Sequence, residues 1–560
     1  MNSRTATTSG NSNTSLVKKK RKSESVDSDL SKKGKNAAMN KVSKRIRGSK
    51  MPVSGVYSVS EMNNLLIQSH GSNYSGIPQW SSAVDHELQD VVLQIENAPV
   101  VENDPNLYAP LYRNVSIFKR SYELMKQTLK VYIYKEGERP ILHTPILQGI
   151  YASEGWFMKQ LEANEEFVTK DPHKAHLFYL PFSSQMLREK LYVPNSHKRR
   201  NIVTYLKNYL DMIAAKYPFW KRTGGADHFL VACHDWAPKE TSRYMGKCIR
   251  ALCNADVGGG FVFAKDVSLP QTYIYSPNDT LRDLGGKPAS ERSTLAFFAG
   301  RMHGYLRPIL LEHWENKDPD MKIFGKLPKT ENAYTNYMKS SKYCISAKGY
   351  QVNSPRVIEA IFYECVPVII SDNYVPPFFD VLNWESFAVF VLEKDIPNLK
   401  KILVSIPEKR YREMQMRVKR VQQHFLWHGT KPVDYDMFHM ANHVHNVSAC
   451  DKDKGHVWGR KTKIGQSKTK IVDREKGSGG FGPSGPGFGP GEKGGGFGPG
   501  FGPGEKGGGF GVGVGPGGGY GSGGGYGGGY GGGGYGDAHS QTSQSEEHDH
   551  DESMMHGRKP

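Results

Sequence analysis

Short apolar segments alternate with helix-length amphipathic segments from residue 129 to residue 427. Apolar runs of this length between amphipathic helices are typical of strands in a parallel sheet that helices cover on both faces. The alternation comes in two successive blocks, which predicts two α/β lobes that face a cleft. The expected strands lie at 129–134, 175–181, 228–233, 260–263, 295–299, 321–324, 343–346, 366–370 and 387–391.

The rest of the chain is organised around this α/β region. Helices are expected at 84–95, 199–216, 241–253, 306–314, 331–340, 356–363, 396–405 and 408–427. We divide the 560 residues into a basic arm (1–55), a linker or stem-like segment (56–125), an N-terminal lobe (126–290), a C-terminal lobe with a closing helix (291–440) and a low-complexity tail (441–560). The arm and the tail are expected to be disordered, because they hold too few apolar side chains to offset the entropy of ordering.

The formal net charge of +18 is unevenly distributed along the chain. Residues 1–50 hold 14 Lys and Arg against 3 acidic residues, so an excess of +11 lies in the basic arm. The arm resembles a nuclear-localisation run and the Gly/Phe/Tyr tail resembles single-strand-binding tails, so a nucleic-acid-associated protein is one alternative. The tail lacks RGG repeats and no RNA-binding module is recognisable, so nucleic acid is not expected as a partner.

The cysteines and the hydropathy pattern give little information about the compartment. The 6 cysteines show no CxxC pair and no metal-ligand spacing, and they do not predict a disulfide scaffold. No apolar run reaches the roughly 18 residues that a transmembrane helix needs, and no signal-peptide core follows Met1.

The segment from Thr294 to Arg307, TLAFFAGRMHGYLR, predicts a strand, a glycine-containing loop and a helix. Phosphate often binds at such a junction, because glycine lets the backbone approach and the helix N-terminus presents free N–H groups. Arg301 at the strand exit and Arg307 in the first turn of the helix are able to hold a diphosphate bidentately. The alternative is that both arginines are ordinary surface charges.

Residues 346–370 predict a second strand, loop and helix, with Lys348 in the loop. The dipeptide Ser354-Pro355 fits the start of the helix. Arg356 and Glu359 lie three residues apart, hence on one helical face, where the arginine is able to neutralise phosphate and the carboxylate to hold ribose hydroxyls. The alternative is an intrahelical Arg–Glu pair facing solvent, and the spacing does not separate the two.

Five long strings give the region between residues 129 and 427 a family resemblance. They are DPHKAHLFYLPF (171–182), DHFLVACHDWAP (227–238), KDVSLP (265–270), LAFFAGRMHGYLRP (295–308) and NSPRVIEAIFYECVPVIISDNYVPPFFDVLNWESFAVFV (353–391). The region resembles the plant exostosin-like glycosyltransferases, relatives of the heparan-sulfate exostosins, over a little more than half of the chain. The resemblance implies a GT-B type fold, with the acceptor-side lobe first and the nucleotide-sugar lobe second.

The resemblance also implies the activity. An inverting glycosyltransferase of this kind would move a sugar from a nucleotide sugar, expected to be a UDP-sugar, to a cell-wall-type polysaccharide or glycan acceptor. By position, Arg301 matches the arginine after the family's strand-end glycine, and Arg356 and Glu359 match its R-x-x-E. Together with Arg307, the residues Lys348 and Ser354 complete the expected donor pocket.

No metal or other cofactor is expected, since the family works without a metal held by a DxD motif and arginines are able to stabilise a leaving diphosphate. DxD strings occur at 318–320, 434–436 and 451–453, but none directly follows a convincing buried strand. The expected partners are the nucleotide-sugar donor, the glycan or polysaccharide acceptor and, as an option, other glycosyltransferases in a hetero-oligomer.

Inversion requires a single displacement, so one base in the first lobe should activate the acceptor hydroxyl. The richest titratable group in that lobe consists of Asp227, His228, His234 and Asp235. His234 and Asp235 follow an expected strand and are the candidate catalytic residues, as base and orienting partner. Asp235 fits a helix cap equally well.

Both ends of the chain depart from the family pattern. Members normally begin with a short cytosolic tail and a membrane anchor and end with one more helix, whereas unrelated sequence is expected here from Ala441 onward. The resemblance implies the Golgi membrane, and the nucleus or cytoplasm is the alternative if the N-terminus is genuine. A further alternative is a catalytically inactive partner subunit, which the retained Arg301, Arg356 and Glu359 argue against.

Overall fold

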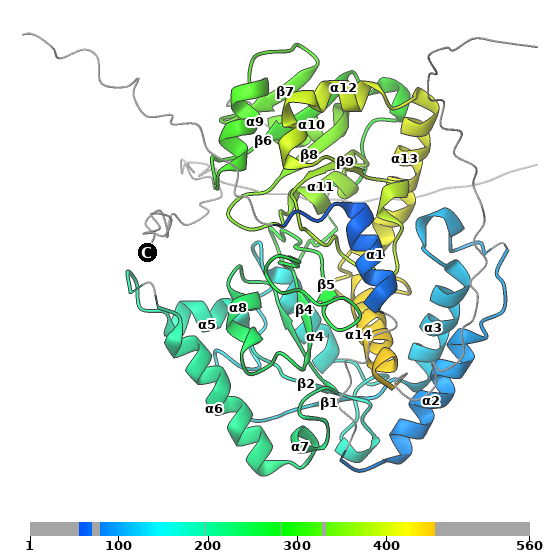
Figure 1. Ribbon diagram of the computed structural model, residues 1–560, viewed down its shortest axis with the longest axis vertical. Helices are drawn as coiled ribbons and strands as arrows, with labels where there is room; N and C mark the ends of the chain where they lie inside the picture. Colours follow the sequence, from blue (N-terminus) through cyan, green and yellow to red (C-terminus); the bar gives the residue numbers. More distant parts are fainter. Residues whose placement is uncertain are drawn as a thin grey trace, which may run out of the picture. The chain divides into compact units, whose positions relative to one another are not determined.

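The computed structural model describes residues 55–69 and 79–453, except residues 103, 197, 282 and 328–331. The basic arm and most of the low-complexity tail lie outside these residues. The chain divides into a larger compact unit, Met1–Tyr192 with Lys198–His456, and a smaller one, Val193–His197 with Val457–Pro560. All helices and strands named below belong to the larger unit (Figure 1).

The first lobe is built on a five-stranded sheet in the order β1-β2-β3-β4-β5, parallel throughout. Every residue of β2, β3 and β4 is buried, as expected for strands that helices cover on both faces. The strands are β1 (Val131–Ile133), β2 (Leu177–Tyr179), β3 (His228–Ala232), β4 (Ile249–Leu252) and β5 (Val267–Ser268). The helices of this lobe are α4 (Ala152–Glu162), α5 (Ser184–Leu191), α6 (Arg200–Lys216), α7 (Phe219–Thr223) and α8 (Ala237–Ser242).

The second lobe has its own five-stranded parallel sheet, in the order β10-β9-β8-β6-β7. The strands are β6 (Thr294–Ala299), β7 (Met321–Phe324), β8 (Ser341–Ala347), β9 (Val366–Ile370) and β10 (Val389–Phe390). The helices are α9 (Leu306–Trp314), α10 (Ala333–Ser340), α11 (Arg356–Phe362), α12 (Leu399–Val404) and α13 (Glu408–Val421). These two sheets confirm the predicted α/β class with two Rossmann-like lobes.

One part of the first lobe differs from the prediction. The helix expected at 241–253 is wrong: α8 ends at Ser242, and Ile249–Leu252 forms β4 in the middle of the sheet. The strand expected at 260–263 is also wrong, because these residues form turns and irregular structure. A short, fully buried strand carries no alternating pattern, so periodicity does not distinguish it from a buried helical turn.

Helices outside the two sheets contact both lobes: Asp85 pairs with Arg222 in the first lobe, and Asn63 donates to Glu385 in the second. The segment expected to be a linker holds α1 (Val59–Ser69), α2 (Ala83–Glu96) and α3 (Val115–Thr128), each with buried side chains. The last described helix, α14 (Met437–Asp453), lies beside α2 and α3 (Figure 1) and also contacts β4 and β5. No helix among the described residues combines the length and the apolar composition that a membrane span requires.

Helix α14 extends past the boundary that we placed at residue 440. The expectation that the family's one further helix is lost from Ala441 onward is therefore wrong. Every residue from Met437 to His445 is buried, so this part of the helix is enclosed on all sides. The polar residues His439, Asn442, His443 and His445 interrupt the apolar pattern by which a buried helix is recognised in a sequence.

The two lobes meet through the segments that leave the carboxyl ends of their strands. Val257 N, after β4, donates to Asn373 O, after β9, at 3.0 Å, and Val375 N donates to Ala255 O at 2.9 Å. The hydroxyl of Ser268, in β5, donates to Val375 O at 2.7 Å. These bonds bring the carboxyl-terminal edges of both sheets to the same region, which is where parallel α/β sheets bind ligands.

Candidate functional site

The strand order of the second lobe defines a crevice. Numbered within this lobe, the strands lie in the order 2-1-3-4-5. The sheet therefore grows to one side of β6 and then to the other, and the strand order reverses between β6 and β8. Loops that leave two such neighbouring strands diverge, and ligands bind outside the carboxyl ends of the strands at this switch point. The segments that contain Arg301 and Lys348 leave these two strands, so both expected donor-binding segments lie at the switch point.

Arg356, the first residue of α11, crosses to the end of β6. Its Nε donates to the carbonyl oxygen of Ala299 at 2.9 Å, and its Nη1 donates to the hydroxyl of Ser354 at 3.3 Å. A Cβ atom on Gly300 would lie 2.8 Å from Arg356 Nη2. The absence of a side chain at Gly300 therefore lets the guanidinium group lie against the strand end.

Arg307, in the first turn of α9, is buried and connects the two diverging loops. Its Nη1 donates to Arg301 O at 3.0 Å and its Nε donates to Ala347 O at 3.3 Å. A Cβ atom on Gly349 would lie 3.2 Å from Arg307 Nη2. Gly304 has a φ of +71°, and a Cβ there would lie 2.2 Å from Gly349 O, so the loops after β6 and β8 approach through two glycines. Arg301 itself is exposed.

Glu359 and Arg356 do not pair with each other. No ion pair joins these two described residues; instead, the hydroxyl of Tyr334 in α10 donates to Glu359 Oε2 at 2.5 Å. Burial, followed by the Glu359 carboxylate, raises the pKa of Tyr334 well above its usual value. The alternative of a solvent-facing intrahelical Arg–Glu pair is therefore not what the structure shows.

Lys348, at the end of β8, is held by an acidic residue that sequence reasoning missed. Its ammonium group lies 2.7 Å from Oε1 of the buried Glu393 and 4.9 Å from the ring centroid of Tyr305. The Tyr305 hydroxyl donates to the other oxygen of Glu393. A signal for Glu393 existed, since an acidic residue shortly after the expected strand 387–391 belongs at the same edge of the sheet.

The four titratable residues proposed around β3 are not all brought together. Asp227 and His228 lie at the beginning of the strand, where Asp227 pairs with Arg222 and His228. His234 and Asp235 follow the end of the strand. A fully extended strand therefore separates the two pairs, and only His234 and Asp235 lie at the ligand-binding edge.

His234 is a buried, neutral side chain. Its Nδ1 accepts a hydrogen bond from Trp236 N at 3.2 Å, and its own backbone N donates to the Ser184 hydroxyl at 2.9 Å. Burial and the nearby Arg188 and Arg199 lower the His234 pKa to about 3.

Asp235 is fixed from two sides. Asn254 Nδ2 donates to Asp235 Oδ1 at 3.0 Å, and burial together with the Asp235 carboxylate raises the pKa of Tyr151. A disulfide joins Cys233 to Cys253. Cys233 directly precedes His234 after β3, and Cys253 directly precedes Asn254 after β4. The carboxylate is thus positioned by a cross-link between β3 and β4.

The described residues include no group of three or more His, Cys, Asp or Glu side chains that could hold a metal ion. Two of the DxD strings have other partners. Asp318 and Asp320 bind Lys400 at 2.6 and 2.9 Å. Asp436 is buried and pairs with His428 and His439.

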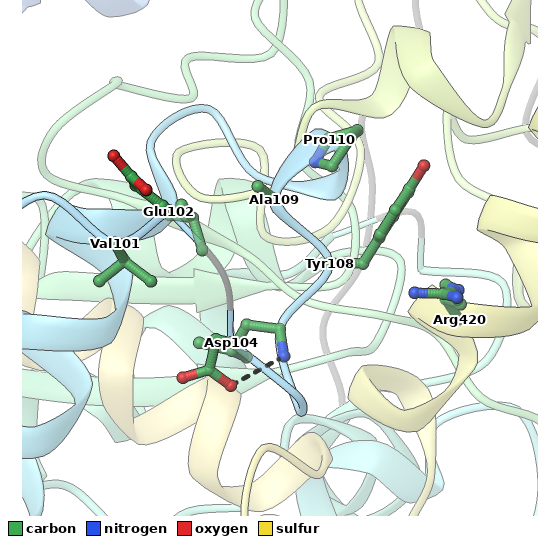
Figure 2. A pocket seen from close by; sticks show the side chains of 9 residues that line it. Val101, Glu102, Asp104, Tyr108, Ala109, Pro110 and Arg420 are labelled. Atoms are coloured by element: carbon green, nitrogen blue, oxygen red, sulfur yellow. Dashed lines mark hydrogen bonds between the residues drawn. The ribbon is translucent and has the colours of Figure 1, made fainter. Parts of the chain in front are cut away.

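A cavity of about 330 Å³ lies outside this region, between the loop before α3 and helix α13. Figure 2 shows Tyr108 beside Arg420, whose guanidinium carbon is 4.4 Å from the ring centroid, with Val101 and Glu102 across the space. None of the expected donor-binding or catalytic residues lines this cavity.

Comparison with known proteins identifies the family. The Exostosin GT47 domain matches residues 125–406. A probable glycosyltransferase of Arabidopsis thaliana is 43% identical over 368 residues, which cover 64% of this chain and 70% of that protein. A probable beta-1,4-xylosyltransferase of the same plant is 29% identical over 303 residues, covering 50% of this chain and 72% of that protein.

The solved structure of the N-terminal domain of Candida albicans trehalose-6-phosphate phosphatase aligns with a TM-score of 0.27 and 7% identity, over 63% of this chain and 97% of that chain. This likeness is too weak to indicate a shared fold. The sequence relatives and the domain match are decisive instead. The chain belongs to the exostosin GT47 family and is a glycosyltransferase, an enzyme that takes a nucleotide-sugar donor and a glycan acceptor.

Proposed function

We propose that this glycosyltransferase transfers a sugar from a UDP-sugar to a cell-wall-type polysaccharide or glycan, with inversion at the anomeric carbon and without a metal ion. The observation that carries the proposal is the placement of Arg356 and Arg307 against Gly300 and Gly349 at the switch point between β6 and β8. Two guanidinium groups beside glycine backbone at this position suit a diphosphate.

Each donor-binding residue has a role that follows from its contacts. Arg356 keeps Nη2 beside Gly300, where it can meet a phosphate oxygen, while Nε and Nη1 hold the side chain in place. Arg301 lies exposed at the mouth of the same crevice, and Arg307 fixes the two loops around it. Ser354 accepts from Arg356 and Lys348 is held by Glu393, so both side chains help to position the site, and Glu359 accepts hydrogen bonds from ribose hydroxyls.

These groups also stabilise the leaving group of the reaction. As the bond between the anomeric carbon and the diphosphate breaks, its electron pair stays on the leaving UDP. Fixed guanidinium groups stabilise that growing charge more in the transition state than in the bound donor, which is what accelerates the step. A metal ion held by carboxylates is therefore not needed for this part of the reaction.

We assign the general base to Asp235. Because Nδ1 of His234 accepts from a backbone N–H, the neutral ring carries its proton on Nε2 and has no free site for another. Asp235 takes the proton of the acceptor hydroxyl while that oxygen forms the new bond to the anomeric carbon. His234 is then a positioning residue beside the carboxylate.

We base the proposed donor and acceptor classes on two relatives of this chain. A probable beta-1,4-xylosyltransferase of Arabidopsis thaliana and a probable glucuronosyltransferase of Oryza sativa are similar to this chain, which supports a UDP-pentose or UDP-uronate donor and a wall-type acceptor. Disulfides Cys233–Cys253 and Cys344–Cys365 support residence in the oxidising lumen of the Golgi, since such bonds are rare in the cytosol. Assembly with other glycosyltransferases is compatible with this location.

Calorimetric titration of UDP into the full-length protein in EDTA tests the donor site. Arg356→Ala and Glu359→Ala should each weaken UDP binding about tenfold or more, since a hydrogen bond to a charged group contributes about 1.5–3 kcal/mol. Arg412→Ala is the matched control, because Arg412 lies on the exposed face of α13 and pairs with Glu408. A folded protein that does not bind UDP, or binds it only with added metal, contradicts the proposal.

A further inference from the structure

Two arginines approach the same tryptophan at the acceptor side of the first lobe. The guanidinium carbons of Arg188 and Arg199 lie 5.9 and 5.7 Å from the ring centroid of Trp236. Arg188 belongs to α5, Arg199 directly precedes α6 and Trp236 directly precedes α8. Three separate elements therefore converge to hold two cations on one aromatic ring.

The ring is fixed by its neighbours. Tyr192 and His234 meet Trp236 edge-on, with ring centroids 4.8 and 5.4 Å away. A rigid aromatic ring attracts guanidinium groups and limits their freedom. The two cations are thereby held in place before a ligand arrives, which reduces the entropy lost on binding.

Neither cation is neutralised by a carboxylate. Within the described part of the chain, neither Arg188 nor Arg199 forms an ion pair within 4 Å, and the nearby Glu189 accepts from Gln185. The segment 188–200 carries Arg188, Lys190, Lys198, Arg199 and Arg200 against this one acidic residue. Burial lowers the pKa of His234, and Arg188 and Arg199 lower it further, so both guanidinium groups act at this place.

One buried acid must be considered as the natural partner of Arg199. Glu240 in α8 is buried, and its two carboxylate oxygens have no hydrogen-bond partner in the structure. Arg199 acts on Glu240 through space and favours its charged form, but it forms no ion pair with it. Arg199 is therefore not engaged in an ion pair with Glu240, and its side chain is only partly buried.

The cluster lies where an acceptor would enter. Helix α5 begins after β2, and His234, Asp235 and Trp236 follow β3, so the cluster occupies the carboxyl-terminal edge of the first sheet. Trp236 is the residue next to Asp235, the base of the proposed reaction. A ligand bound by the two arginines thus lies beside the group that activates the acceptor hydroxyl.

We propose that Arg188 and Arg199, held by Trp236, bind the carboxylates of an acidic acceptor, so that the enzyme acts on a polysaccharide that contains uronic acids. A guanidinium group matches a carboxylate with two parallel hydrogen bonds, and two such groups suit a chain with repeated carboxylates. This inference rests on the proposed function, because it identifies the acceptor of that reaction.

The experiment measures binding of two oligosaccharides of equal length to the full-length protein. One is a hexamer of galacturonic acid, and the other is the same hexamer with its carboxyl groups reduced to alcohols. We expect the acidic hexamer to bind at least about tenfold more tightly and to lose affinity as salt increases. The double variant Arg188→Ala/Arg199→Ala should lose at least about tenfold for the acidic hexamer and show no change for the neutral one.

A matched variant controls for total charge. Lys190→Ala/Arg200→Ala removes the same charge from exposed positions of the same segment and should change the affinity less than threefold, a difference of about 0.65 kcal/mol. If Arg199 acted only to neutralise Glu240, the Glu240→Gln background would abolish the effect of Arg199→Ala. We expect that effect to persist.

Several outcomes overturn the inference. They are equal affinity for the two hexamers, equal loss in the control variant, no binding of the acidic hexamer, or disappearance of the Arg199→Ala effect in Glu240→Gln. Binding of UDP, measured on the same preparations, separates this failure from failure of the proposed function. If the protein binds UDP but has the same affinity for both hexamers, the acidic acceptor is refuted and the proposed donor site is not.

Discussion

Arg356 Nε donates to the carbonyl oxygen of Ala299 at 2.9 Å, so the first residue of α11 is tied to the last residue of β6. The bond spans the switch point of the second sheet. Its effect is to hold the guanidinium group over Gly300, where a larger residue would occupy the same space. Donor binding as proposed above therefore depends on a residue that has no side chain.

Gly300→Ala should therefore impair donor binding more than folding. The new Cβ would lie 2.8 Å from Arg356 Nη2, which is the mobile end of a long side chain, so the arginine can move aside. We expect UDP affinity to fall about tenfold, as for loss of one charged hydrogen bond, with a small change in melting temperature. Calorimetry and thermal unfolding on the same sample measure both quantities.

Two other glycines provide the comparison for Gly300→Ala. Gly55→Ala should change neither property, because nothing lies within 4 Å of its Cβ position. Gly304→Ala should lower stability, since its φ is +71° and its Cβ would lie 2.2 Å from Gly349 O. A Gly300→Ala protein that binds UDP like the wild type would show that Arg356 is not placed by this contact.

The second lobe was largely predictable from the sequence, and the reason is physical. Its strands are short apolar runs between long amphipathic helices, and β7, β9 and α9 begin and end at the expected residues. The segments with Arg301 and Lys348 were expected after strands, and parallel strands bring such segments to one edge. Glycine and arginine just after a strand thus predict, from a short segment, a binding site that the fold assembles from several segments.

Other parts of the site could not be predicted because they depend on distant contacts. Tyr334 reaches Glu359 from another helix, and nothing in its own segment marks it. Nothing in the segments of Arg188 and Arg199 marks these residues, and only the fold brings both to Trp236. Pairing of the cysteines likewise requires the strand order, which spacing does not reveal.

Asp235→Asn should reduce the turnover number while leaving UDP affinity unchanged. Amide nitrogen cannot take up the proton of the acceptor hydroxyl, and loss of a general base costs roughly 10²–10⁴-fold in rate. Asn254→Ala keeps the carboxylate but removes the hydrogen bond that orients it, so a smaller loss is expected. Release of UDP from UDP-sugars in the presence of acceptor measures the rate.

A contrast with His234 checks the assignment of the base. His234→Gln keeps a polar side chain without a basic nitrogen, and we expect it to retain more activity than Asp235→Asn. If His234 were the base, the activity of the wild type would show a pH transition near 3 that is absent from His234→Gln. We expect no such difference between the two pH profiles. Greater loss in His234→Gln than in Asp235→Asn would move the base to the histidine.

The two disulfides should have separable effects. Cys365→Ser removes the link between β8 and the residue before β9, and a loop of 21 residues predicts a loss of about 3 kcal/mol in the free energy of unfolding. Cys253→Ser should in addition lower the turnover number, because Cys233–Cys253 holds the strand exits that carry Asp235 and Asn254. Chemical denaturation and activity assays below the unfolding midpoint measure the two effects. Equal activity in both variants would contradict the positioning role.

Glu240 predicts how stability changes with pH. Burial raises its pKa from 4.5 to about 7, so the folded protein keeps this proton between these values while the unfolded chain releases it. The unfolded state binds fewer protons in that window, so the contribution of Glu240 to stability is complete below pH 4.5 and is lost as the pH rises through about 7. A shift of this size corresponds to roughly 3 kcal/mol in the free energy of unfolding.

Glu240→Gln isolates this contribution, because both carboxylate oxygens lack hydrogen-bond partners and the amide is close in size. We expect the variant to gain stability relative to the wild type at pH 8 and to show little difference at pH 5. Asp211→Asn is the control, since Asp211 is an exposed partner of Lys207, and its difference from the wild type should not grow between these pH values. The comparison uses differences between proteins at each pH, so the opposite contributions of His234, His424 and His443, whose pKa values burial lowers, cancel. A Glu240→Gln protein whose advantage is the same at both pH values would show that this acid does not titrate between them.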